Sequence, residues 1–300
     1  MNRKDIAYAV GRMQAYIERH ITEPITLLEL ARCAGYSPFH AARIFREEVG
    51  KTPFAYIRAL RMTKAALTLR DQDKRVLDVA LDFVFDSHEG FTRAFSREFG
   101  ITPHKYQQRP VPLRLFLPYS AKDRYVFYTK GEQTMEKKET STIFVQVIER
   151  PKRKLILKRG MKAEDYFAYC EELGCDIWGI LTSIKDALYE PIGMWLPKKL
   201  QPAGTSEYAQ GVEVPLDYAG EIPEGFEIVT LEPCKMMIFQ GQPYDDAYFE
   251  TAILALQDAI KDYDPTLYGY VWADEDAPRF QLEPVCDRGY IEGRPVKEKK

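Results

Sequence analysis

Two stretches of the sequence decide the fold: HAARIFREEVGKTPFAY, residues 40–56, and GFTRAFSREFGITPHKY, residues 90–106. They share one pattern at an offset of 50 residues. Counted from the serine that precedes each stretch, the identical positions include Ser37/Ser87, Arg43/Arg93, Phe45/Phe95, Gly50/Gly100, Thr52/Thr102, Pro53/Pro103 and Tyr56/Tyr106. Because these identities fall on helix caps, helix stops and one apolar face, they predict a structural repeat.

The offset falls to 49 residues just upstream, where Ala31 matches Ala80 and Tyr36 matches Phe85. The two offsets differ by one residue, and the change lies between the first helix of each copy and the serine that starts the second. The second copy is therefore predicted to carry one extra residue in its turn.

Each copy has the pattern of a helix, a tight turn and a second helix. Thr26, followed by Glu29 three positions later, is typical of a capping box, and glycines mark the helix stops. The long helical stretch that follows Thr52 is predicted to be a rigid connector. Residues 1–110 are therefore predicted to be all-α, with helix-turn-helix units at about 26–50 and 75–100.

Charge is distributed unevenly along a chain whose net charge is −3. Residues 1–110 carry a net +5, residues 111–160 a net +7 and residues 161–300 a net −15. A basic front part favours a polyanionic partner for that part, and an acidic back part favours a different partner. The alternative is that the charge drifts along the chain without functional meaning.

Length and composition limit the class of protein. Three hundred residues are enough for about two domains, and 45% hydrophobic residues are enough for ordinary cores. The sequence has no apolar run of about 18 residues and no signal-peptide pattern at its start. Its five cysteines are an odd number without a C-x-x-C pair, so we expect reduced thiols in a cytoplasmic protein without a metal or other cofactor.

Residues 8–108 resemble the DNA-binding domain of the AraC family of transcriptional regulators. The strongest signature is DVALDFVFDSHEGFTRAFSREFGITPHKY, residues 78–106. The resemblance implies two helix-turn-helix units, joined by one long helix, whose second helices enter adjacent major-groove segments of double-stranded DNA. Two helical hairpins without a role in DNA binding are the alternative that the spacing alone leaves open.

The same resemblance implies roles for individual residues. Arg43 and Arg93 stand where the family has base-contacting arginines, which can reach O6 and N7 of guanine. The predicted base contacts are Phe39, His40, Arg43, His88, Glu89 and Arg93. The predicted phosphate contacts, each equally compatible with a solvated charge, are Arg46, Lys51, Arg61, Arg97 and Lys105. The second helix-turn-helix has the richer reading surface, which predicts an asymmetric DNA site.

The back part has strand and helix patterns of its own. Residues 111–140 are predicted to be a linker with one or two short strands, and residues 141–298 an α+β domain. This domain also repeats, with Pro151 matching Pro233 and Ile156 matching Ile238. Two strand-strand-helix-strand-strand units side by side are expected to leave a groove for a ligand.

Three stretches of the back part resemble the GyrI-like effector-binding domain: EYAQGVEV (207–214), PEGFEIVTLEPCKMMIFQG (223–241) and RGYIEGRPVK (288–297). The resemblance covers about residues 142–298. It implies multidrug sensing, in which lipophilic and often cationic molecules bind between aromatic rings beside a buried glutamate.

The sequence departs from that family at Gln281, where a glutamate is common. Glu283, two residues on, is expected on the same side of the strand, and Glu292 with its counterpart Glu213 offers further carboxylates. For each aromatic candidate, packing in the hydrophobic core explains the residue at least as well as contact with a ligand does. The predicted ligand-binding residues are Trp178, Trp195, Tyr208, Glu213, Tyr270, Trp272, Phe280, Glu283 and Glu292.

Catalysis finds no support in the back part. It has no histidine, which excludes Ser/His and Cys/His pairs there, and the chain has no G-x-S-x-G motif. We therefore predict a regulator, not an enzyme, in which a small organic effector changes DNA affinity, contact with RNA polymerase or the protein's level. Two alternatives stay open: a back domain that binds a partner or hydrolyses a small molecule, and one that only stabilises the chain.

Overall fold

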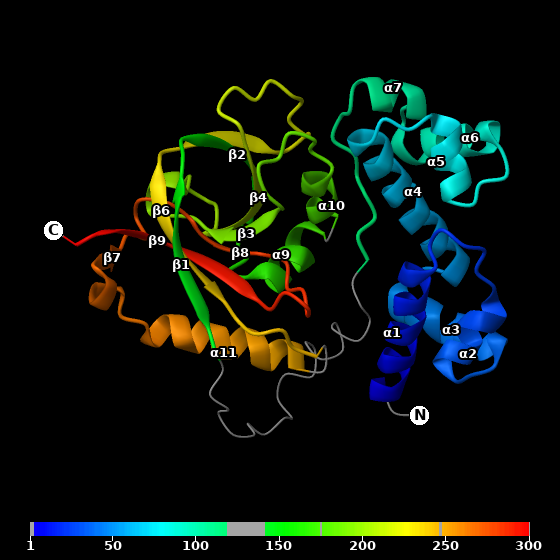
Figure 1. The fold of residues 1–300 in the computed structure, drawn as a ribbon, viewed down its shortest axis with the longest axis horizontal. Helices are drawn as coiled ribbons and strands as arrows, with labels where there is room; N and C mark the ends of the chain where they lie inside the picture. The colour runs from blue at the N-terminus through cyan, green and yellow to red at the C-terminus, as the bar shows by residue number, and fades with distance from the viewer. Residues whose placement is uncertain (1–2, 119–141, 175, 246–247, 300) are drawn as a thin grey trace. The chain divides into compact units, whose positions relative to one another are not determined.

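The structure is a computed structural model that describes residues 3–118, 142–174, 176–245 and 248–299. The chain forms two compact units, residues 1–133 and residues 134–300 (Figure 1). Among the described residues, no helix has both the length and the apolar character needed to cross a membrane.

The first unit is entirely helical over its described residues, which confirms the prediction of an all-α front part. Its helices are α1 (Arg3–Arg19), α2 (Leu27–Ala34), α3 (Pro38–Val49), α4 (Pro53–Asp71), α5 (Val76–Asp82), α6 (His88–Phe99) and α7 (Pro103–Gln108). Helices α2 and α3 form the first helix-turn-helix, and α5 and α6 form the second.

Local capping groups determine where most of these helices begin and end. Thr26 and Glu29 form the predicted capping box, in which each residue satisfies a backbone N–H of the other. Helices α3, α4, α6 and α7 begin after a serine or threonine whose hydroxyl accepts from the N–H three residues later: Ser37, Thr52, Ser87 and Thr102. Left-handed glycines end three helices, with φ of 76°, 75° and 71°: Gly35, Gly50 and Gly100.

The extra residue in the second turn is Asp86. The Tyr36 N–H donates to the Ala31 carbonyl at 3.1 Å, and the Phe85 N–H donates to the Ala80 carbonyl at 2.9 Å, so both turns match as far as this residue. The N-cap serine then follows directly in the first copy, whereas Asp86 precedes it in the second. The predicted one-residue insertion is confirmed.

Helix α4 contributes to two separate hydrophobic cores. Its first half places Ile57 and Leu60 in the core of the first helix-turn-helix, around Phe45. Its second half places Ala66 and Leu69 in the core of the second, around residues that include Phe91, Phe95 and Tyr106. One helix therefore carries both helix-turn-helix units.

The segment after α7 differs from the predicted linker. Leu113 and Leu115 are buried in the second core, and the Phe116 backbone is hydrogen-bonded to the Thr63 hydroxyl on α4. Residues 111–118 contain no strand, and they pack against the helical unit because their leucines complete its core. The remainder of the predicted linker, residues 119–140, lies outside the described residues.

The second unit is built on one antiparallel sheet with helices on one face, which confirms its α+β composition. Its strands are β1 (Phe144–Arg150), β2 (Arg153–Arg159), β3 (Ile192–Trp195), β4 (Tyr208–Val214), β5 (Glu227–Leu231), β6 (Cys234–Gln240), β7 (Tyr270–Trp272), β8 (Arg279–Gln281) and β9 (Ile291–Glu298). Its helices are α9 (Tyr166–Leu173), α10 (Ile177–Thr182) and α11 (Phe249–Asp262), with short 3-10 turns at Lys198–Leu200 and Pro265–Tyr268.

The strand order β1-β6-β9-β8-β3-β4-β2-β5 is symmetric about its centre, between β8 and β3. Units β1–β4 and β5–β9 therefore repeat, with β7 as an addition that pairs with β9. The first strand of each unit pairs with the second strand of the other, β1 with β6 and β5 with β2. This exchange joins the two repeats into one sheet.

The predicted register between the repeats is wrong by one residue. Ile156 packs with Tyr169 and Leu181 on the face that α9 and α10 cover. Ile238 instead packs with Leu155 and Met194 on the opposite face. Because successive strand residues point to opposite faces, a shift of one residue exchanges the two faces.

We expect the capping box at the start of α2 to support the first helix-turn-helix. Replacing Thr26 with alanine removes an N-cap acceptor and should cost about 1 kcal/mol in the free energy of unfolding at pH 7. Urea unfolding of the full chain, followed by far-UV circular dichroism, measures this cost. An exposed threonine on β5, Thr230→Ala, serves as the matched control.

The same variant should lose part of its effect in acid. Hydrogen bonds from Thr26 lower the pKa of Glu29 below its usual value. A lowered pKa in the folded state stabilises the protein above the unfolded-state pKa, and this stabilisation is lost as the pH falls through the folded-state pKa. The difference between wild type and Thr26→Ala should therefore shrink below about pH 4. A difference that stays constant down to pH 3 would contradict this origin.

Candidate nucleic-acid interface and ligand site

Helix α3 presents a polar row at its exposed start. Phe39 is 82% exposed, and the His40 ring nitrogen Nδ1 lies 3.1 Å from Arg43 Nη2. Arg43 also pairs with Glu47 one turn later, Nη1 to Oε1 at 3.4 Å. Ala41 and its apolar neighbours on the other face are buried. The residues predicted to contact bases therefore share the solvent face of this helix.

Helix α6 repeats this arrangement with different side chains. His88, Glu89 and Arg93 are exposed, whereas Phe91 and Phe95 are completely buried. Arg93 forms no ion pair with any described residue, so its guanidinium is available to an external acceptor. The helix thus offers an uncommitted arginine beside a histidine and a carboxylate.

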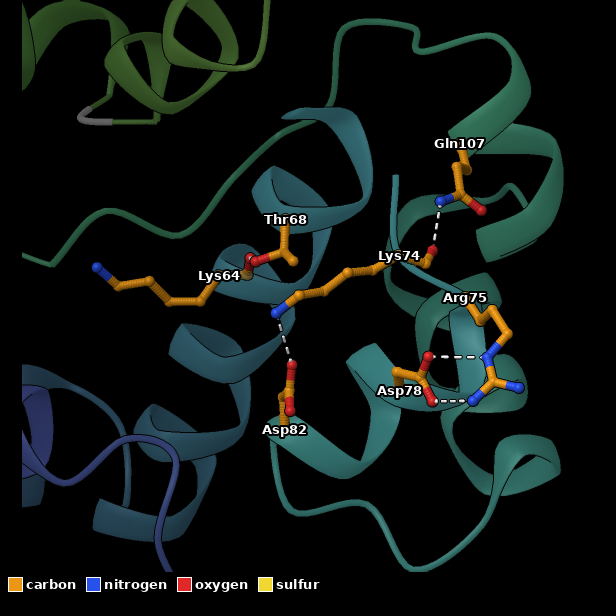
Figure 2. A network of polar contacts seen from close by, with 7 residues as sticks. All are labelled: Lys64, Thr68, Lys74, Arg75, Asp78, Asp82 and Gln107. Carbon is orange, nitrogen blue, oxygen red and sulfur yellow. Dashed lines mark hydrogen bonds and ion pairs between the residues drawn. The ribbon is translucent and has the colours of Figure 1, made fainter. Parts of the chain in front are cut away.

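A polar network holds the start of α5, the supporting helix of the second helix-turn-helix (Figure 2). Lys74 Nζ lies 3.1 Å from Asp82 Oδ2, and Gln107 Nε2 donates to the Lys74 carbonyl at 2.6 Å. Arg75 and Asp78 form a two-pronged pair at 2.9 Å, which lowers the pKa of Asp78 and raises that of Arg75. These contacts join the α4–α5 loop to α5 and α7.

The candidate phosphate contacts divide into two groups. Arg46, Lys51, Arg97 and Lys105 are exposed, as a phosphate contact requires. Arg61 has another role: its Nε donates to the Ile21 carbonyl at 2.9 Å and its Nη2 to the Glu23 carbonyl at 2.5 Å. Burial lowers the pKa of Arg61. The prediction for this residue is corrected, because the unsatisfied carbonyls that follow α1 bind its guanidinium.

Comparison with known proteins places the same residues in a DNA-binding module. A family profile described as a helix-turn-helix domain matches residues 30–109. The right origin-binding protein of Escherichia coli K12 is 40% identical over 106 residues, which are 35% of this chain and 37% of that protein. The regulatory protein SoxS of E. coli K12 is 36% identical over 95 residues, 32% of this chain and 89% of SoxS.

A solved structure described as an AraC-type transcriptional regulator from Chromobacterium violaceum is 24% identical and covers 34% of this chain and 95% of its own, with a TM-score of 0.33. The chain spans a little over a third of the length of the right origin-binding protein.

Two helix-turn-helix units on one connecting helix, each with an exposed polar face on its second helix, define a DNA-binding regulator. The matched profile and the coverage of SoxS then specify the family. The chain belongs to the AraC family of helix-turn-helix transcriptional regulators.

In the second unit, a polar row crosses the face of the sheet that carries the helices. Gln210, Gly193, Gln281 and Glu292 lie directly opposite one another on the adjacent strands β4, β3, β8 and β9. The next partner is Phe239 on β6, which packs against α11. Because paired residues in an antiparallel sheet share a face, the row runs across the junction of the two repeats.

The row is hydrogen-bonded, but no Lys or Arg among the described residues balances its negative charge. Tyr290 Oη lies 2.8 Å from Glu292 Oε1 and 2.9 Å from Gln281 Oε1, and Gln257 Nε2 of α11 donates to Glu292 at 3.0 Å. Burial, together with Glu292, raises the pKa of Tyr290 well above its usual value and keeps its hydroxyl protonated. Glu292 is only 4% exposed and forms no ion pair with any described residue.

The middle of the row is shaped by a glycine. A Cβ atom at Gly193 would lie 2.2 Å from Tyr208 Oη, so only glycine admits this hydroxyl. Gln281 Nε2 donates to the same Tyr208 oxygen at 3.2 Å. Gln210 is 1% exposed, and its Nε2 has no hydrogen-bond partner among the described residues. Sequence reasoning singled out Tyr208 and Glu292 but missed Gln210, Gln257 and Tyr290, for which no local signal exists.

Two of the predicted carboxylates have other roles. Glu213 is buried between two arginines, with Oε2 2.5 Å from Arg150 Nη1 and Oε1 2.8 Å from Arg153 Nε. It lies opposite Leu155, on the other face of the sheet, so it is neither the counterpart of Glu292 nor a free counter-charge. Glu283 lies beyond the end of β8 and is exposed, so it does not share the strand face of Gln281.

The predicted aromatic residues are dispersed. Only Trp195 joins Tyr208 beside the row, with ring centres 5.4 Å apart. Phe280 is buried on the opposite face. Trp178 packs on Tyr166, while Tyr270 and Trp272 lie on β7, where Arg294 covers the Trp272 ring at 4.0 Å.

We expect Arg93→Ala to weaken specific DNA binding by about 1–3 kcal/mol and to relax one base position, because a guanidinium that reads a guanine edge is lost. Arg97→Ala, one turn further along the same helix, is the matched control. A phosphate contact at Arg97 should weaken binding to specific and scrambled duplexes equally. Competition binding with single-base variants of a selected duplex measures both effects. An unchanged specificity ratio in Arg93→Ala would contradict its assignment.

Proposed function

We propose that this regulator binds a specific asymmetric DNA site and that its second unit binds a small organic effector, lipophilic or aromatic and preferentially cationic. The single observation that carries the effector proposal is the buried carboxylate of Glu292, which faces only neutral donors among the described residues. The resemblance of residues 142–298 to GyrI-like domains supports the same proposal.

The electrostatic reason is the cost of burying an unpaired charge. An ionised carboxylate removed from water is penalised by several kcal/mol unless it is paired. Tyr290 and Gln257 each supply one neutral hydrogen bond, which compensates only part of this penalty. A cationic ligand group beside Glu292 supplies the missing charge. The ring of Trp195 and the unpaired amide of Gln210 offer a stacking surface and a donor.

Comparison with Glu213 singles out Glu292 as the carboxylate that a cationic ligand can neutralise. Both carboxylates are about 4% exposed, yet Glu213 contacts two arginines, whereas Glu292 contacts no arginine in the part of the chain that the structure describes. The first is neutralised within the protein, so the second is the residue whose charge a ligand can balance. Effector binding then changes DNA affinity, contact with RNA polymerase or the protein's level.

The DNA part of the proposal rests on a difference between α3 and α6, the second helices of the two helix-turn-helix units. Arg43 on α3 is engaged by His40 and Glu47, whereas Arg93 on α6 has no described partner. The guanidinium of Arg93 on α6 can therefore bind an external acceptor without breaking a contact to another described residue. We propose that the half-site read by α6 is the more tightly specified of the two.

We expect lipophilic amines and quaternary ammonium compounds to raise the melting temperature of the full chain, and neutral compounds of equal size to raise it less. A ligand at 100 times its Kd stabilises the folded state by about 2.7 kcal/mol. Glu292→Gln should weaken cation binding by about 2–5 kcal/mol, the usual effect of losing one partner of a buried charge pair. Thermal shift and calorimetric titration measure these changes.

Glu283→Gln is the matched control, since it removes an exposed carboxylate that lies outside the row. It should leave the thermal shift unchanged. Equal responses of Glu292→Gln and wild type to cations would contradict the proposed site. Turnover of any compound that depends on Glu292 would favour a hydrolytic role instead.

A further inference from the structure

A hollow of about 420 Å³ lies between α4 and the second helix-turn-helix, within the helical unit. One wall of the hollow belongs to α4 and is formed by Phe54, Arg58 and Arg61. The opposite wall includes Asp86 from the turn, the N-cap Ser87, and Gly90 of α6. The hollow exists because α6 turns a flank of small residues, Gly90 and Ala94, towards α4.

Arg58 and Arg61 differ in what their guanidinium groups do. Arg61 is committed to two backbone carbonyls after α1. Arg58, one turn earlier on α4, is exposed and forms no hydrogen bond or ion pair with any described residue. The hollow therefore has one uncommitted cation in its wall. The carboxylate of Asp86, the residue inserted in the second turn, is also exposed there.

The position of the hollow relates it to DNA. Gly90 and Ala94 lie one helical turn apart on a flank of α6, next to the face that carries Glu89 and Arg93. A helix that reads a major groove has a sugar–phosphate strand on each side of it. In that arrangement, the strand on the α4 side of α6 would pass the mouth of this hollow, and because α4 connects the two helix-turn-helix units, it would be the strand that crosses between them.

We propose that this hollow binds the DNA phosphodiester backbone between the two major-groove segments, with Arg58 as its phosphate-binding residue. The proposal rests on the proposed two-headed DNA binding. Phe54, which is 51% exposed at the same wall, supplies an apolar surface for a deoxyribose. The carboxylate of Asp86 repels the phosphate and so weakens the contact, which therefore depends on the positions of both α3 and α6 on the DNA.

The test compares full-chain wild type with Arg58→Gln, Arg58→Lys, Asp86→Asn and a control, Lys64→Gln. Lys64, labelled in Figure 2, is an exposed cation of the same helix, and it is not among the residues that line the hollow. Each protein is titrated with a duplex selected by the wild type from a random pool, and with a scrambled duplex, between 50 and 200 mM KCl (roughly the range over which phosphate contacts lose affinity).

Arg58→Gln should lower the slope of log K against log salt by about 0.9 and weaken both duplexes by the same factor, about tenfold at low salt. Arg58→Lys should keep the wild-type slope, because it keeps the charge. Asp86→Asn should bind more tightly, and Lys64→Gln should behave as the wild type. Thermal melts verify that each variant is folded.

Methylphosphonate substitution locates the contact. Neutralising one or two phosphates between the two groove segments should weaken the wild type and leave Arg58→Gln unaffected. The proposal is overturned if Arg58→Gln keeps the wild-type slope or the wild-type methylphosphonate pattern. It is equally overturned if inorganic pyrophosphate stabilises the wild type through Arg58 while the DNA slope does not change. A wild type that selects no duplex would instead refute the proposed function itself.

Discussion

The packing of one helix into two hydrophobic cores is the constraint on which the DNA-binding unit depends. The first half of α4 completes one core with Ile57 and Leu60, and its second half completes another with Ala66 and Leu69. A continuous backbone hydrogen-bond ladder resists bending, so this helix determines the separation and relative rotation of the two reading helices. Under the proposed function, the DNA site matches that spacing, and one chain reads two groove segments.

Two buried carboxylates of the second unit differ in their electrostatic environment. Glu213 on β4 lies between Arg150 of β1 and Arg153 of β2, all three on strands of the first repeat. Glu292 has only neutral donors among the described residues, and it is the carboxylate that we propose to pair with a cationic ligand. The two carboxylates are not structural counterparts, because Glu213 faces the side of the sheet that carries Leu155, whereas Glu292 faces the side that carries the helices.

Local signals were sufficient for most of the fold. Thr26, Ser87 and Gly100 act through hydrogen bonds and backbone angles within a few residues of themselves, so the pattern alone located the helices that they begin or end. Strand β7 was not predicted from the sequence. The face of Ile238 was wrongly predicted, since period-two patterns specify a strand but not its register with a distant copy.

The sequence by itself determined the repeat, the inserted residue in the second turn and the exposed face of each reading helix, because each is written in short-range spacing. Tertiary structure alone decided which cations are free and which carboxylates are paired. Arg61 is engaged by carbonyls some 40 residues away, Arg58 is not, and Glu213 meets Arg150 across 63 residues. Such partnerships depend on long-range packing and strand register, which no local pattern encodes.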